Sequence, residues 1–189
     1  MQADFSVECG AGDEVLEIPW SSSDGKAAYL DLKQHPEKLC EVAEAEANPP
    51  LRDFLAKINA RPRLRTAKCD AWFTRELKPE EEVFQAAGKF GSYVDVFFTE
   101  AAARNSIAAN EKLASELVRL LQRAPEIQAA VELCVRRCYV NELLDAPETS
   151  DGFYLTAYVF GFGEDEDSAA KHWAIALHLL QNAMLQLAR

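Results

Sequence analysis

Three times along the chain, two runs with the alternation of a β-strand are followed by a stretch with helical spacing. Turn-forming residues, Gly25, Gly91 and Gly152, precede the second strand-like run of each unit. Alternating apolar residues need one covered face, which the helices can supply. The pattern predicts an α+β fold, in which three ββα-like units form one antiparallel sheet of about six strands with helices packed on one face. Amphipathic hairpins also resemble one another without a repeat, because alternation and turn chemistry impose the likeness.

The boundaries of these elements follow from periodicity and from Pro, Gly and Ser positions. The predicted strands cover residues 15–20, 26–32, 66–73, 93–98, 131–140 and 153–160, and the predicted helical segments cover 36–47, 51–58, 79–87, 105–123 and 168–189.

The length of 189 residues predicts one domain over 1–189, because domains typically hold about 100–200 residues. The polar, acidic start of the chain predicts a loosely ordered N-terminal arm over residues 1–13. That segment lacks the basic and apolar stretches of a secretory signal peptide. No apolar run approaches the roughly 18 residues needed to span a membrane.

The charge balance is strongly acidic, with 20 basic against 31 acidic residues and a net charge of −11. Nucleic-acid binding needs a basic footprint, and anionic membrane surfaces attract basic segments. We therefore expect neither a nucleic acid nor a membrane among the partners.

The five cysteines are scattered, which is not the pattern of a disulfide framework. Free thiols favour a reducing compartment, so we predict a cytoplasmic protein. The chain has no Cys-x-x-Cys pair, and Cys134 and Cys138 would lie about 13 Å apart on a strand, too far for one metal ion. We expect no structural metal and no cofactor.

Three carboxylates fall on the sheet face opposite the aliphatic residues, namely Asp31, Asp70 and Asp95. If their strands are neighbours, these side chains could hold Mg²⁺ or Mn²⁺, or serve as acid and base. They are the candidate catalytic residues of an alternative hypothesis, a metal-dependent hydrolase. Salt bridges with nearby Lys and Arg residues are the commoner outcome for such carboxylates, and we prefer that interpretation.

The same face should carry the aromatic side chains of Tyr29, Trp72 and Tyr93. A contiguous apolar patch of this size usually marks a surface for a partner or ligand. The alternative is cover by the N-terminal arm, by the 79–87 helix or by a second copy of the chain.

Arg136 and Arg137 are successive residues of a predicted strand, so they point to opposite faces. A half-buried arginine needs a carboxylate partner within the chain or an anionic ligand. The leading hypothesis is therefore a non-catalytic binding or protein-interaction module with an aromatic and charged sheet face. Its expected partner is a second copy or another protein, and a small ligand is also possible. The sequence does not decide whether the protein is an enzyme.

Overall fold

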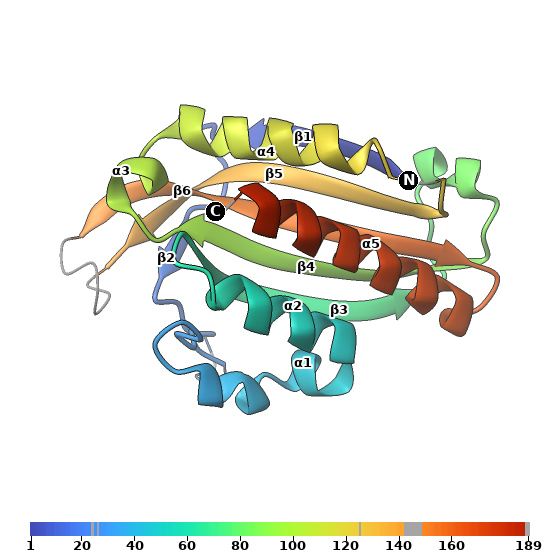
Figure 1. Cartoon of the computed structure of the whole chain (residues 1–189), viewed down its shortest axis with the longest axis horizontal. Coiled ribbons are helices and arrows are strands. Elements are labelled where there is room, and N and C mark those ends of the chain that lie inside the picture. Colours follow the sequence, from blue (N-terminus) through green and yellow to red (C-terminus); the bar gives the residue numbers. More distant parts are fainter. Residues whose placement is uncertain (24, 26, 125, 142–148, 188–189) are drawn as a thin grey trace.

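A six-stranded sheet with helices on one face forms the framework of the protein, seen here in a computed structural model (Figure 1). The structure describes residues 1–23, 25, 27–124, 126–141 and 149–187. The strands are β1 (Gln2–Glu8), β2 (Leu16–Ile18), β3 (Leu64–Thr74), β4 (Gly88–Phe98), β5 (Ala129–Val140) and β6 (Ser150–Gly163). The α-helices are α1 (Ala43–Ala47), α2 (Pro49–Asn59), α3 (Ala101–Arg104), α4 (Ile107–Leu121) and α5 (Glu166–Leu187), and the 3₁₀ helices are η1 (Pro36–Glu41) and η2 (Pro79–Phe84).

The strand order is β1-β5-β6-β4-β3, and β2 also pairs with β5. The pairs β3–β4, β4–β6 and β5–β6 are antiparallel, whereas β1 and β2 both run parallel to β5. The α+β class and the six strands are confirmed, but the sheet is mixed rather than antiparallel. The difference arises because two short N-terminal segments add to the free edge of β5 instead of forming a hairpin of their own.

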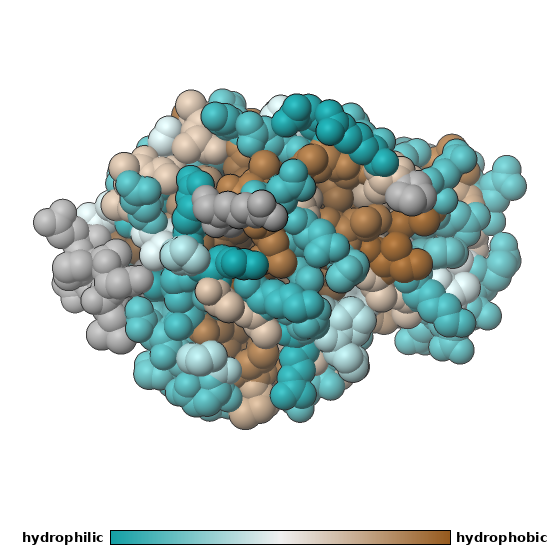
Figure 2. Space-filling model, in the orientation of Figure 1, coloured by the Kyte–Doolittle hydropathy of each residue, from teal (hydrophilic) through white to brown (hydrophobic). Residues whose placement is uncertain are grey.

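Helices α2, α4 and α5 lie side by side over one face of the sheet (Figure 1). Ser106 caps α4 by accepting a hydrogen bond from the backbone N–H of Ala109. Helix α5 sits very close to β6 because Gly161 has no side chain there, and a Cβ at Gly161 would lie 2.0 Å from the backbone nitrogen of Trp173. In the space-filling view of this side, hydrophobic residues are visible beside and between the helices (Figure 2).

Two of the three predicted units, β3–β4–α4 and β5–β6–α5, have the expected ββα order. The first unit does not. Its second strand, predicted over 26–32, is replaced by a loop with a single isolated bridge between Ser21 and Ala28, while Lys26 lies outside the described residues. The apolar residues of this segment do not form a strand face but pack on both sides of the sheet. Leu32 packs into the core on the helix side, whereas Tyr29 packs on the opposite side.

The N-terminal segment is also more ordered than expected. Residues 1–13 include β1, which pairs with β5 over its whole length. Ala3 and Phe5 pack against the core beneath the helices, so apolar burial ties the strand to the sheet. None of the helices in the described part of the chain is long and apolar enough to cross a membrane.

Candidate functional site

The sheet face opposite the helices is covered at both ends by the chain itself. At one end, Leu16, Ile18 and Trp20 pack on Phe97 and Tyr154. At the other end, the β3–β4 connection folds back onto the sheet, where Leu77, Phe84 and Ala86 pack on Phe160 and Phe162. The cover expected from the 79–87 segment is thus present at one end, whereas the N-terminal arm, residues 1–13, does not cover this face because it forms the edge strand β1. The cover at the other end comes from the residues that follow the arm.

Between the two covers lies an open groove of about 760 Å³, called the groove below. Its lining comes from β1, β3, β4, β5 and β6 and from the residues that follow β3. The lining residues used below are Glu8, Trp72, Lys89, Arg136, Tyr158 and Phe160. The groove is therefore built by the whole width of the sheet rather than by one loop.

A row of aromatic side chains crosses the sheet at the groove. The ring of Trp72 lies 6.4 Å from that of Tyr93 and 6.4 Å from that of Phe160, centre to centre. Tyr158 lies 6.0 Å from Tyr93 and 6.3 Å from Phe160. Gly91 is the β4 residue between Trp72 and Phe160, and a Cβ there would lie 3.1 Å from both rings. This glycine leaves the space in which the two rings meet.

Arg136 extends from β5 over this aromatic row. Its guanidinium donates hydrogen bonds of 2.9 and 2.7 Å to one carboxylate oxygen of Glu8 and a bond of 3.1 Å to the hydroxyl of Tyr158. The guanidinium carbon lies 5.7 Å from the centre of the Tyr158 ring, within the range of a cation–π contact. Burial lowers the pKa of Arg136, but its bonds with Glu8 and Tyr158 outweigh that effect and hold the pKa above its ordinary value.

Lys89 and Glu81 form a buried ion pair at the end of the groove. The ammonium of Lys89 donates to both carboxylate oxygens of Glu81, at 2.6 and 2.7 Å. The same ammonium lies 4.9 Å from the centre of the Phe160 ring. The pair ties η2 to β4 and so fixes the cover beside the groove. The Lys89–Glu81 pair was not predicted from the sequence. The available signal was the lysine itself, which lies within an otherwise largely apolar strand.

Asp95 is buried on this face, with only 4% of its surface exposed. The hydroxyl of Thr156, directly opposite on β6, donates a 2.7 Å hydrogen bond to its carboxylate. Burial raises the pKa of Asp95 from 3.8 to about 6, against the opposing effects of this bond and of the Lys68 and Arg136 charges. Asp95 also contributes, after burial, to raising the pKa of Tyr93. The site thus contains a carboxyl group that changes charge near neutral pH.

The three predicted candidate carboxylates do not gather into one site. Asp31 binds Arg65 through a 2.9 Å ion pair, and Asp70 is exposed and accepts a bond from the N–H of Ala71. In the part of the chain that the structure describes, no group of three or more His, Cys, Asp or Glu side chains is placed to hold a metal ion.

The predicted ligand-binding residues divide between the groove and other places. Trp72 and Arg136 line the groove, and the ring of Tyr93 lies beside that of Trp72. Tyr29 belongs to the N-terminal cover and packs with the cluster around Ile18. Arg137 is exposed, one residue after Arg136 on the same strand and therefore on the helix side. Comparison with protein-family models, with curated proteins and with solved structures found no match.

Proposed function

We propose that this protein is a non-catalytic interaction module that binds a segment of another polypeptide in the groove. One observation carries the proposal: Trp72, Tyr158 and Arg136 lie together on the part of the sheet face that the described residues leave uncovered. Trp, Tyr and Arg are the residue types that supply most of the binding energy at protein interfaces.

The form of the groove supports a peptide as its occupant. An open groove across several strands exposes aromatic faces along its length, whereas most small-molecule sites bury 70% or more of a ligand. Trp72, Tyr93 and Tyr158 are each half-buried, so their rings already have fixed positions and still offer surface. A preorganised aromatic surface loses little conformational entropy when a partner binds.

The charges near the groove indicate the chemistry of the partner. Arg136 is neutralised by Glu8 and Lys89 by Glu81, so neither cation is free for an anionic ligand. The whole chain carries a net charge of −11, which attracts basic partners at long range. The segment that fits is therefore net basic and carries one or two large apolar side chains to pack on the aromatic row.

A random peptide library displayed on phage tests the proposal, with the immobilised wild-type protein as bait. Selected peptides should be enriched in Lys or Arg together with aromatic or aliphatic residues. Calorimetry should show that their affinity falls at least about tenfold for Trp72→Ala, equivalent to about 1.4 kcal/mol. The affinity of Trp72→Leu for the same peptides should lie between the affinities of Trp72→Ala and the wild type, because leucine keeps more apolar volume than alanine.

The matched control is Ile175→Ala, which removes an exposed apolar side chain from α5 on the opposite side of the sheet. Thermal unfolding of each variant verifies that it is folded before binding is measured. Selected peptides that bind Trp72→Ala and wild type equally well, or a selection that yields no binding peptide, would contradict the proposal.

A further inference from the structure

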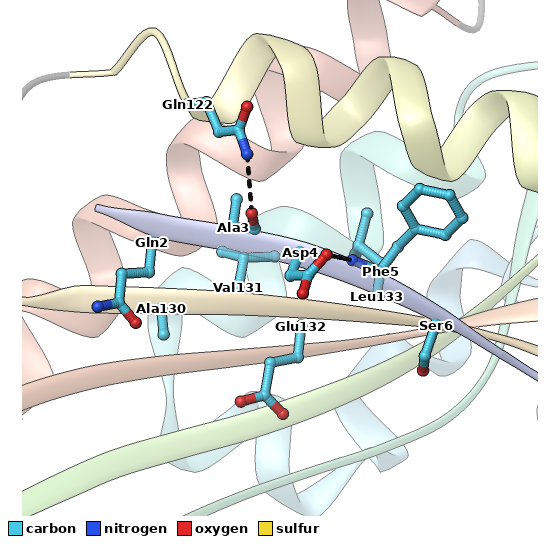
Figure 3. A pocket seen from close by; sticks show the side chains of 10 residues that line it. All are labelled: Gln2, Ala3, Asp4, Phe5, Ser6, Gln122, Ala130, Val131, Glu132 and Leu133. Atoms are coloured by element: carbon cyan, nitrogen blue, oxygen red, sulfur yellow. Dashed lines mark hydrogen bonds between the residues drawn. The ribbon is translucent and has the colours of Figure 1, made fainter. Parts of the chain in front are cut away.

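Strand β1 forms one edge of the sheet, and in the described structure its only strand partner is β5. Two backbone groups on its outer side are held by exposed side chains: the amide of Gln122 donates to the carbonyl of Ala3, and the N–H of Phe5 donates to the carboxylate of Asp4 (Figure 3). Because backbone groups alternate along a strand, the odd-numbered residues of β1 direct theirs away from β5. A hollow of about 660 Å³ follows this strand from Gln2 to Ser6.

We infer that β1 is the contact surface for a second copy of this chain, paired antiparallel with its own β1 about a two-fold axis at Phe5. A free strand edge is a template for another strand, and pairing with itself satisfies both copies at once. Backbone bonds from Ala3, Phe5 and Val7 would replace the bonds that Gln122 and Asp4 now supply. One continuous sheet would then run through both copies.

The charges along β1 select this register from its alternatives. In two antiparallel copies of β1, directly opposed side chains must lie on the same face of the sheet, which requires the two-fold axis to pass through a residue. Only axes at Asp4, Phe5 or Ser6 then pair at least five residues of β1 with the second copy. An axis at Asp4 sets Asp4 against its own copy, and an axis at Ser6 sets Asp4 against Glu8. An axis at Phe5 sets Asp4 against Ser6 and Glu8 against Gln2, so no two carboxylates are directly opposed.

The apolar side of the strand also fits this pairing. Ala3, Phe5 and Val7 alternate on the helix side, and Val7 is 40% exposed in the single chain. An axis at Phe5 sets the two Phe5 rings against each other and Val7 against Ala3 of the second copy, which removes apolar surface from water. Even-numbered residues of both copies then share the other face, so the two grooves open on the same side of the double sheet.

Sedimentation equilibrium on the full chain tests the pairing, with two substitutions at the exposed Ser6. In the Phe5-centred register, residue 6 faces Asp4 of the second copy twice per dimer. Ser6→Lys should therefore tighten dimerisation by about threefold or more, and Ser6→Glu should weaken it by a similar factor. A Ser6-centred axis would make both variants weaker, and an Asp4-centred axis would set residue 6 against the uncharged Gln2.

Val7→Pro supplies the test of the edge itself. The N–H of Val7 points outward, so the variant keeps the bonds of β1 to β5 but cannot pair on the outer side. It should be monomeric, while Ile175→Ser on α5 should dimerise like the wild type. A wild-type protein that stays monomeric at its highest soluble concentration, a dimer that survives Val7→Pro, or Ser6 variants that do not shift in opposite directions would overturn the inference.

Discussion

The buried carboxyl group of Asp95 should make the free energy of unfolding depend on pH near neutrality. Its pKa rises from 3.8 to about 6 on folding, mainly because burial penalises the charged form. The folded state therefore holds this proton more tightly than the unfolded chain does. Its contribution to stability is complete below the unfolded pKa near 3.8 and is lost as pH rises through about 6. A shift of about two pKa units corresponds to a cost of about 3 kcal/mol above that pH.

Asp95→Asn removes this cost, since the amide is neutral at every pH. Any change in the hydrogen bond with Thr156 affects both pH values similarly and cancels in the comparison. Urea unfolding of the two proteins should show the variant gaining about 1.5 kcal/mol relative to wild type between pH 5 and pH 8. Asp70→Asn is the matched control, because the same change is then made to an exposed side chain on the same face. The reasoning would be refuted if the difference in free energy of unfolding between Asp95→Asn and wild type were the same at pH 5 and pH 8. It would also be refuted if the variant lost stability relative to wild type on going to pH 8.

Three further predictions concern the packing around the sheet. Gly161→Ala should lower the free energy of unfolding in urea by about 3 kcal/mol or more, because the added Cβ would meet the backbone of α5. Gly12→Ala is the control: a Cβ there would have no atom within 4 Å, so the free energy of unfolding should change little. Lys89→Met should cost about 3–5 kcal/mol by leaving Glu81 charged and buried, and adding Glu81→Met should recover part of that loss. The thiol of Cys69, whose pKa burial raises to about 12, should react with a disulfide reagent far more slowly in the native protein than in denaturant; equal rates would place it in solvent.

The longest strands and helices were predicted correctly because their periodicity is strict. The β3–β4 and β5–β6 hairpins and helices α4 and α5 alternate or repeat over enough residues that one face must be buried. The loop at 27–32 shows the same alternation, but its apolar residues pack on two sides of the sheet instead of pairing. Local pattern cannot distinguish these cases, because the decision depends on which residues are near in space.

Trp72 and Arg136 of the groove were predicted from the sequence, whereas Lys89 and Glu8 were not. Alternation alone sets Trp72, Tyr93 and Asp95 on one face. The bond between Arg136 and Glu8 joins residues 128 positions apart, and it exists because β1 adds in parallel to β5. Strand β1 has only seven residues of mixed polarity, and no local pattern predicts that they pair in parallel at the edge of a sheet. The segment was therefore predicted to be a loose arm.

Mapping a selected peptide by ¹H–¹⁵N NMR tests most directly whether the groove is the binding surface. If the peptide binds in the groove, the NMR signals of the Trp72 indole N–H and of the backbone amides of Lys89 and Tyr158 should shift on titration, while the amide signal of Ile175 on α5 should not. Shifts confined to the helix side of the sheet, with the Trp72 indole signal unchanged at saturating peptide, would contradict binding in the groove.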